Sequence, residues 1–209
     1  MDQWKVIECD VAREFEIFYN DKGVKEMPQL IFMCQKEIHL SHEKNSGEGR
    51  HKMAIDKVRE YFRQYNMEDR IREFEVSSAT VELAAQALSC APARIAKTLS
   101  FMVGEQPVLI VAAGDVKIDN SKYKKQFGTK AKMLTPDQVE ELIGHAVGGV
   151  CPFGVKEGVK VYLDESLKRF ETVFPACGSS NSAIELTIPE MEQYAGEEGW
   201  IDVCKGKEE

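Results

Sequence analysis

The chain has 209 residues, of which 43% are hydrophobic and 30% charged, and its net charge is −8. These values are typical of one globular domain, alone or with an appendage, and the negative charge argues against non-specific binding to DNA. The longest strongly apolar run, Val108–Ala113, is too short to cross a bilayer, and the first residues lack the basic and apolar pattern of a signal peptide. We therefore expect a cytoplasmic protein without a membrane or DNA partner.

Six cysteines stand at positions 9, 34, 90, 151, 177 and 204. No C-x-x-C pair occurs, so neither a zinc ribbon nor a thioredoxin-type motif is supported, and a cytoplasmic location favours free thiols. Cys34, His39 and His42 could hold a metal if Cys9 or His51 supplied a fourth ligand. Because that pattern is weak, we expect no metal and no cofactor.

Residues 1–52 differ from the rest of the chain, and we treat them as an N-terminal extension or appendage. Their apolar residues, Phe15–Tyr19 and Leu30–Met33, could form a hairpin or a strand–helix unit. Glu43–Lys52 is polar, contains glycine and resembles a linker. An alternative is that the chain starts at Met53 and that the gene is read too long. In either case we expect residues 53–209 to form the main domain.

The first elements after Met53 follow from apolar spacing and capping signals. A helix is expected with Ile55, Val58, Phe62 and Tyr65 on one face, followed by a short strand near Phe74 and Val76. Ser78 or Thr80 can cap a helix over Val81–Leu88, and Pro92 fits the first turn of another.

Two strands then follow in succession. Ala96–Val103 alternates with a period of two, which predicts a strand, and Val108–Ala113 predicts a buried strand after a turn at 104–106. Lys97 stands on the strand face that also carries Leu99 and Phe101. A cation at that place must reach solvent, find an acceptor or bind an anion. A lysine that merely extends to solvent at the strand end is the alternative.

The last third of the chain interleaves short helices and strands. Thr135 followed by Pro136 and Gln138 is a strong helix start, and Gly144 should end that helix. The other expected helices are 121–127, 165–170 and one that opens at Pro189, and the expected strands are 159–163, 172–174 and 183–188. Because no regular βαβ period occurs, the pattern predicts an α+β (mixed α/β) fold. We expect a curved mixed β-sheet with a barrel-like core and short surrounding helices.

Two glycine-containing segments could approach a ligand. Gly148–Gly154 carries three glycines around a proline, which lets the backbone come close to a bound group. Ala176–Ser182 is polar and turn-forming, and its hydroxyls and amide could bind a ligand or only their own backbone. Each segment could also be a tight structural turn.

Two further groups of residues invite a functional interpretation. Cys177 and His145 could form a nucleophile and its base, although an apolar neighbourhood favours an inert thiol. A lysine-rich stretch carries a single acid, Asp119, and could contact a phosphate backbone or form a solvated helix face. Its lysines are Lys117, Lys122, Lys124, Lys125, Lys130 and Lys132.

Taken together, these segments resemble the YbaK/EbsC family of trans-acting aminoacyl-tRNA deacylases, which is similar to the editing insertion domain of prolyl-tRNA synthetases. The resemblance covers about residues 53–195. It rests on five motifs in order: Ala96-Lys97-Thr98-Leu99, Ala113-Gly114-Asp115, Gly148-x-x-x-Pro152-Phe153-Gly154, Val161-Tyr162-Leu163-Asp164, and Gly178-Ser179-x-Asn181 before Ile184-Glu185-Leu186.

The resemblance implies a YbaK-like fold and a role for each matching position. It implies that Lys97 and Gly148 are catalytic and that the two glycine segments line a pocket for the aminoacyl group. The implied substrate-binding residues are Thr98, Gly149, Pro152, Phe153, Gly154, Gly178, Ser179 and Asn181, and Lys117, Lys122, Lys124 and Lys125 would contact tRNA.

The resemblance also implies an activity. The expected reaction is hydrolysis of the ester of mischarged tRNA in trans, with tRNA-Pro carrying a small amino acid such as Cys or Ala as the substrate. The expected partners are mischarged aminoacyl-tRNA and an aminoacyl-tRNA synthetase. The alternative is a non-catalytic module on the same fold that binds tRNA or a synthetase.

Overall fold

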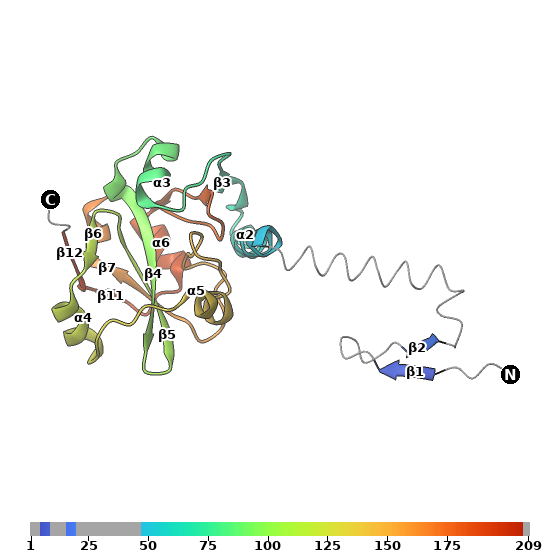
Figure 1. The fold of residues 1–209 in the computed structure, drawn as a ribbon. Helices are drawn as coiled ribbons and strands as arrows, with labels where there is room; N and C mark the ends of the chain where they lie inside the picture. Colours follow the sequence, from blue (N-terminus) through green and yellow to red (C-terminus); the bar gives the residue numbers. More distant parts are fainter. Residues whose placement is uncertain (1–4, 9–15, 20–46, 207–209) are drawn as a thin grey trace. The chain divides into compact units, whose positions relative to one another are not determined.

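A computed structural model describes residues 5–8, 16–19 and 47–206 of the protein (Figure 1). The chain divides into two compact units, Met1–Ser46 and Gly47–Glu209. In the first unit, strand β1 (Lys5–Glu8) pairs antiparallel with β2 (Glu16–Tyr19). The expected segment Leu30–Met33 and the Cys34, His39 and His42 group lie outside the described residues.

The second unit is built on one mixed sheet of six strands in the order β10-β8-β4-β5-β7-β11. β4 pairs antiparallel with β5 and parallel with β8, and β7 pairs parallel with both β5 and β11. The sheet is curled, which confirms the expected α+β fold with a curved mixed sheet. The strands are β4 (Ile95–Val103), β5 (Gln106–Ala113), β7 (Lys160–Asp164), β8 (Thr172–Pro175), β10 (Leu186–Thr187) and β11 (Trp200–Ile201).

Two small ladders flank this sheet. β3 (Arg72–Glu73) pairs antiparallel with β9 (Ser182–Ala183), and β6 (Val116–Ile118) pairs antiparallel with β12 (Cys204–Gly206). The chain after Ile118 forms α4 (Asn120–Phe127), which lies beside β6 and β12 in Figure 1. The sequence does not predict the β6–β12 ladder, because strands of three residues are too short to show a period-two pattern.

Short helices surround the sheet. They are α2 (Gly47–Arg63), α3 (Val81–Leu88), α4, α5 (Pro136–Gln138), which continues as a π turn over Val139–Ile143, and α6 (Ile188–Ala195). Single 3₁₀ turns cover Glu68–Arg70, Pro92–Arg94 and Glu165–Arg169. The expected helices at 55–65, 81–88, 121–127 and 135–143 are therefore all present.

Helix α2 carries the apolar face that its sequence predicts. Val58 and Phe62 are fully buried, and the ring centroid of Phe62 lies 4.7 Å from that of Phe153. Tyr65 follows the end of the helix and is 39% exposed, so it adds little to this face. The helix begins at Gly47, so the second half of the expected linker, 47–52, is helical.

Two expected strands differ from the structure. The strand expected near Phe74 and Val76 lies two residues earlier, at Arg72–Glu73, and Val76 is 62% exposed. The strand expected over 183–188 is split, because Ser182–Ala183 pairs with β3 while Leu186–Thr187 pairs with β8. Thr187 then caps α6, which draws Ile188 into the helix.

Candidate functional site

Lys97 lies on β4, one residue beyond the point where the pairing of β4 with β8 ends. Its Cα partner on one side is Ala112 of β5. On the other side the preceding residue, Ala96, pairs with Pro175 at the end of β8. The chain that leaves β8 at Pro175 runs directly into Gly178–Asn181. The sheet register therefore brings Lys97 next to the start of one of the two glycine segments.

The ammonium group of Lys97 has acceptors within the protein. Its Nζ donates to the carbonyl oxygens of Gly114, at 3.1 Å, and Val116. Its charge also reaches Asp115, whose pKa is lowered mainly by hydrogen bonds from Arg169 and to a smaller degree by Lys97. A partly buried cation at this place thus finds the acceptors that its position in the strand requires.

The two glycine segments are in direct contact. The Gly178 N–H donates to the Gly149 carbonyl oxygen at 3.1 Å. A Cβ on Gly149 would come within 2.6 Å of the Ser179 nitrogen, and one on Gly178 would come within 2.7 Å of the Ala54 carbonyl oxygen. Both glycines are therefore required by backbone packing, which supports the structural interpretation of the segments as well as the functional one.

The peptide N–H groups of the first segment are not equivalent. The Gly149 N–H donates to the Ala146 carbonyl oxygen at 3.1 Å, so it is not available to a ligand. The Gly148 N–H has no hydrogen-bond partner among the residues that the structure describes. Gly148 has a φ of 91°, a backbone conformation that favours glycine. Among the described residues, the Gly148 N–H is therefore the one of these two that is unpaired.

The polar side chains of the second segment bind the protein itself. The Asn181 Nδ2 donates to the Phe74 carbonyl oxygen at 2.8 Å, and its Oδ1 accepts from the Ser179 hydroxyl at 2.9 Å. The Ser179 hydroxyl also lies 2.7 Å from the hydroxyl of Ser182. These bonds fasten the segment to the chain around Phe74. The substrate contacts expected of Asn181 and Ser179 remain predictions.

The end of the first segment belongs to the core. Pro152 is buried, and Phe153 is fully buried against Phe62 of α2. Gly154 has a φ of 58° and lies over the backbone of Lys57. The substrate contact expected of Phe153 remains a prediction, and in this structure the ring packs inside the core. Pro152 and Gly154 hold the turn that leads into this core.

The alternative of a cysteine nucleophile is not supported. His145 lies beside Cys151 rather than Cys177: its Nδ1 accepts from the Cys151 N–H at 3.4 Å and lies 3.8 Å from the Cys151 Sγ. Burial raises the pKa of Cys151 to about 12 and that of Cys177 well above its usual range. Burial also lowers the pKa of His145 to about 4. Neutral buried thiols of this kind are inert.

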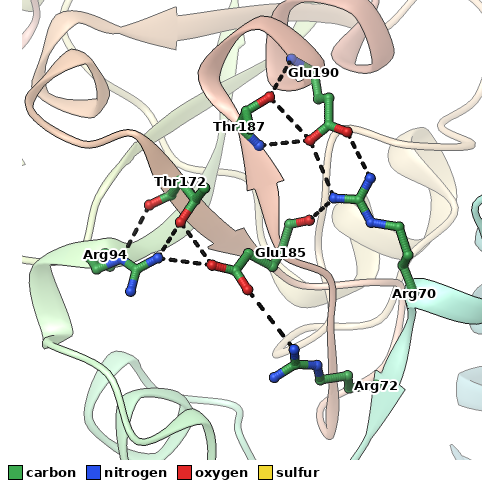
Figure 2. A network of polar contacts seen from close by, with 7 residues as sticks. All are labelled: Arg70, Arg72, Arg94, Thr172, Glu185, Thr187 and Glu190. Atoms are coloured by element: carbon green, nitrogen blue, oxygen red, sulfur yellow. Dashed lines mark hydrogen bonds and ion pairs between the residues drawn. The ribbon is translucent and has the colours of Figure 1, made fainter.

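A polar network fixes the chain that follows the second segment (Figure 2). Glu185 Oε1 accepts from Arg94 at 3.0 Å and from the Thr172 hydroxyl at 2.8 Å. Arg70 donates to Glu190 at 2.7 Å and also binds the Glu185 carbonyl oxygen. The network joins β8, α6 and the turn before β3. No local sequence pattern predicts this network, because its residues are far apart in the chain and form no motif.

The lysines expected to contact tRNA differ in their partners. Lys117, Lys124 and Lys125 are exposed. Lys122 instead donates to Asp202 at 2.7 Å and to the Cys204 carbonyl oxygen at 3.0 Å, so it fastens α4 to the C-terminal strand. Lys205 of β12, which was not predicted, lies opposite Lys117 in the ladder. The tRNA contact expected of Lys122 remains a prediction. Lys205, which pairs with Asp119 at 3.6 Å, joins the exposed cations of this surface.

Within the described ranges, no group of three or more His, Cys, Asp or Glu side chains is arranged to hold a metal ion. In the same ranges, no helix has both the length and the apolar character that crossing a membrane requires.

Comparisons with known proteins define the class of protein. A solved structure described as a candidate trans-editing enzyme for prolyl tRNA synthetase superposes with a TM-score of 0.67 at 27% identity, over 73% of this chain and 98% of that chain. A family model described as the aminoacyl-tRNA editing domain matches residues 75–194. The chain therefore belongs to the aminoacyl-tRNA editing domain family, as the resemblance to the YbaK/EbsC proteins predicts.

Two sequence relatives add to this picture. YwhH of Bacillus subtilis, an uncharacterized protein, is 57% identical over 154 residues, which cover 73% of this chain and 98% of YwhH. The proline--tRNA ligase of Aquifex aeolicus is 36% identical over 131 residues, which cover 62% of this chain and 23% of the ligase. The chain thus matches a whole small protein in one case and less than a quarter of a synthetase in the other.

Proposed function

We propose that this protein hydrolyses the ester bond of mischarged aminoacyl-tRNA in trans. The observation that carries the proposal is the position of Lys97 on β4, next to the point where β8 leads into the Gly178 segment. That segment in turn is hydrogen-bonded to the Gly148 segment. Three of the motifs on which the resemblance rests, those of Lys97, Gly148 and Gly178, are thereby connected in one part of the fold, in a chain that belongs to the editing family.

The chemistry requires little beyond positioning and charge. Water adds to the ester carbonyl carbon, the bond to the ribose oxygen breaks, and the products are a free amino acid and tRNA with a free hydroxyl. Because the ester is already activated, stabilising the developing oxyanion and orienting the water suffice. In this proposal Lys97 supplies positive charge near the oxyanion, and the Gly148 N–H donates to the terminal ribose.

We further propose that the substrate is tRNA-Pro that carries a small amino acid such as Cys or Ala. The similarity to part of a proline--tRNA ligase supports this choice of tRNA. Size alone discriminates small amino acids by only about 1–3 kcal/mol per methylene.

The proposed tRNA surface consists of Lys117, Lys124, Lys125 and Lys205. All four are exposed side chains on β6, α4 and β12. An acidic protein can hold an acceptor stem through such a local cluster, with an affinity that falls as salt rises. We assign the activity to residues 53–209, with α2 beginning a few residues earlier at Gly47.

The test is deacylation of Cys-, Ala- and Ser-tRNA-Pro by the wild-type protein and two variants. Lys97→Ala removes the side chain, and Lys97→Met keeps most of its apolar stem. Loss of a charged group that stabilises an oxyanion should lower kcat by about 10²–10³. Lys160→Ala, a lysine paired with Glu198 at 3.5 Å, is the control for a lost charge elsewhere. Full turnover by folded Lys97→Ala and Lys97→Met would refute the role of Lys97.

A non-catalytic binding module is the second candidate, and one observation favours it. Two backbone carbonyls hold the Lys97 ammonium, as they would in a purely structural role. This candidate predicts that the wild-type protein binds tRNA-Pro or a synthetase but releases no amino acid above background. In that case Lys97→Met should lower the melting temperature without changing any rate.

A further inference from the structure

Within the described part of the chain, the ladder between β4 and β8 is short. On the β5 side the strand is paired continuously from Ala96 to Val103. On the other side, β8 pairs only with Ile95 and Ala96. The next contacts on that side are hydrogen bonds from the Leu134 N–H to the Ser100 carbonyl, at 3.1 Å, and from the Met102 N–H to the Lys132 carbonyl, at 2.9 Å. Residues 97–99 therefore lie in a gap between two ladders.

Thr98 presents its backbone to this gap. Along a strand, the N–H and C=O of one residue point to one side, and those of the next residue point to the other. Because Ser100 and Met102 bond away from β5, Thr98 also directs its N–H and C=O away from β5. Neither group has a hydrogen-bond partner among the described residues.

The side chain of Thr98 adds a third unpaired polar group. Its hydroxyl is buried and forms no hydrogen bond within the described part of the chain. Buried polar groups are nearly always paired, and an unpaired one destabilises the fold. Thr98 thus carries one buried unpaired hydroxyl and two backbone groups without a partner in the described part of the chain. This combination, beside the segment that leaves β8, points to a ligand that satisfies them.

An aminoacyl ester matches this edge. It has an α-ammonium donor and a carbonyl acceptor on adjacent atoms, like the N–H and C=O of one residue in an extended strand. Two residues that face each other in a hydrogen-bonded antiparallel pair exchange both bonds, and peptides bind sheet edges in the same way. Building on the proposed function, we infer that the aminoacyl group binds to Thr98 as a strand of one residue. The Thr98 N–H donates to the ester carbonyl oxygen, and the Thr98 C=O accepts from the α-ammonium group.

This arrangement gives Thr98 a catalytic as well as a binding role. The carbonyl oxygen that accepts from the Thr98 N–H is the atom that becomes negative when water adds. A backbone donor fixed in a strand needs no reorganisation at that moment. Since both contacts are made by the backbone, they do not depend on the side chain of the amino acid. In this arrangement, discrimination among amino acids by their side chains depends on the two glycine segments that surround the site.

The experiment compares two variants that differ in one N–H group. Thr98→Val keeps the backbone and removes the hydroxyl. Incorporation of α-hydroxyisovaleric acid at position 98 gives the same side chain but replaces the peptide N–H by an ester oxygen. With Ala-tRNA-Pro or Cys-tRNA-Pro, the ester variant should have a kcat about 10²–10³ lower than Thr98→Val. The corresponding ester at position 102, whose N–H bonds Lys132, should lower stability but leave kcat within a few-fold of the wild-type value.

The outcomes separate this inference from the proposed function. If the wild-type protein releases no amino acid from any mischarged tRNA, the proposed function fails and the inference fails with it. If the wild-type protein is active and the folded ester variant is as fast as Thr98→Val, only the inference is overturned. A propionyl ester lacks the ammonium group, so the wild-type protein should accelerate its hydrolysis over the uncatalysed rate more than tenfold less than that of the alanyl ester. Equal rate enhancements for the two esters would exclude the contact with the Thr98 C=O.

Discussion

At the scale of single residues, close backbone approach determines where glycine is needed. Gly149 shows this most clearly, because the Cβ of any other residue would meet backbone atoms of Gly178 and Ser179 rather than a side chain that can move. His145 shows a second residue-scale effect: it is buried, neutral and bonded through Nδ1 to the peptide N–H of Cys151. Both residues fix the shape of the Gly148 segment without contacting a substrate in our proposal.

Gly149→Ala should destabilise the protein and lower its activity. The added Cβ would lie 2.6 Å from the Ser179 nitrogen, and neither backbone can yield easily. Overpacking of this kind costs about 1–3 kcal/mol, measurable as the free energy of unfolding in urea. Gly206→Ala is the control, because nothing lies within 4 Å of its Cβ position. Equal stability of the two variants would contradict the tight contact between the segments.

His145 should make the protein less stable in mild acid. Burial, followed by the charge of Lys57, lowers its pKa from 6.5 to about 4. Between these values the unfolded chain binds a proton that the folded chain does not, so stability falls as the pH drops from about 6.5 to about 4. The total loss is about 3 kcal/mol.

The measurement is the free energy of unfolding of wild type and His145→Gln at pH 7, 6 and 5. Glutamine cannot take up a proton, so the variant should lose less stability than wild type over this interval. Parallel curves for the two proteins would show that His145 does not titrate between pH 7 and 5.

At the scale of elements, caps and pairing decide where each segment begins and ends. The predicted Thr135 start has a complete capping box with Gln138. Of the two predicted candidates for the cap of α3, Ser78 and Thr80, the structure uses Thr80. The cap at Thr187 escaped prediction, because the preceding residues form a plausible continuous strand. In the structure, Thr187 accepts from the Glu190 N–H, and the Glu190 carboxylate accepts from Thr187 and Arg70. These bonds hold the pKa of Glu190 at about 2.

Thr187→Ala should therefore cost about 1 kcal/mol of stability. It removes the hydroxyl that caps α6 and one partner of the Glu190 carboxylate, and the loss of a cap typically costs about 0.5–2 kcal/mol. Thr129→Ala, an exposed threonine in a loop, is the matched control and should have little effect. Thermal unfolding of both variants at pH 7 makes the comparison. A Thr187→Ala midpoint equal to that of Thr129→Ala would show that the cap contributes little.

At the scale of the whole molecule, the distribution of charge over the surface matters more for tRNA binding than the net charge. The net charge of −8 opposes contact with nucleic acid, yet exposed lysines gather on β6, α4 and β12. Three of them, Lys117, Lys124 and Lys125, were predicted, and Lys205 enters only because β12 pairs with β6. The proposed tRNA surface is thus assembled from two parts of the chain about 80 residues apart.

This surface should make tRNA affinity strongly salt-dependent. The double variant Lys124→Ala/Lys125→Ala should bind deacylated tRNA-Pro more weakly than the wild-type protein. The slope of log K against the logarithm of the salt concentration, where K is the association constant, should be less negative by about 1–2. Lys160→Ala/Lys168→Ala removes the same charge from lysines that pair with Glu198 and Glu165. Equal slopes for the two double variants would place the tRNA elsewhere.

The sequence by itself determined the class of fold, most of the helices and the central strands, because apolar period and capping are local properties. It also determined the family, through short motifs kept in order. Only the tertiary structure decided what each motif residue contacts. Asn181 and Phe153 are engaged within the protein, Lys97 meets the carbonyls of Gly114 and Val116, and Thr98 is left at an unpaired edge. Sheet pairing and loop packing determine which residues distant in the chain become hydrogen-bond partners. A local pattern of residues therefore does not predict these partners.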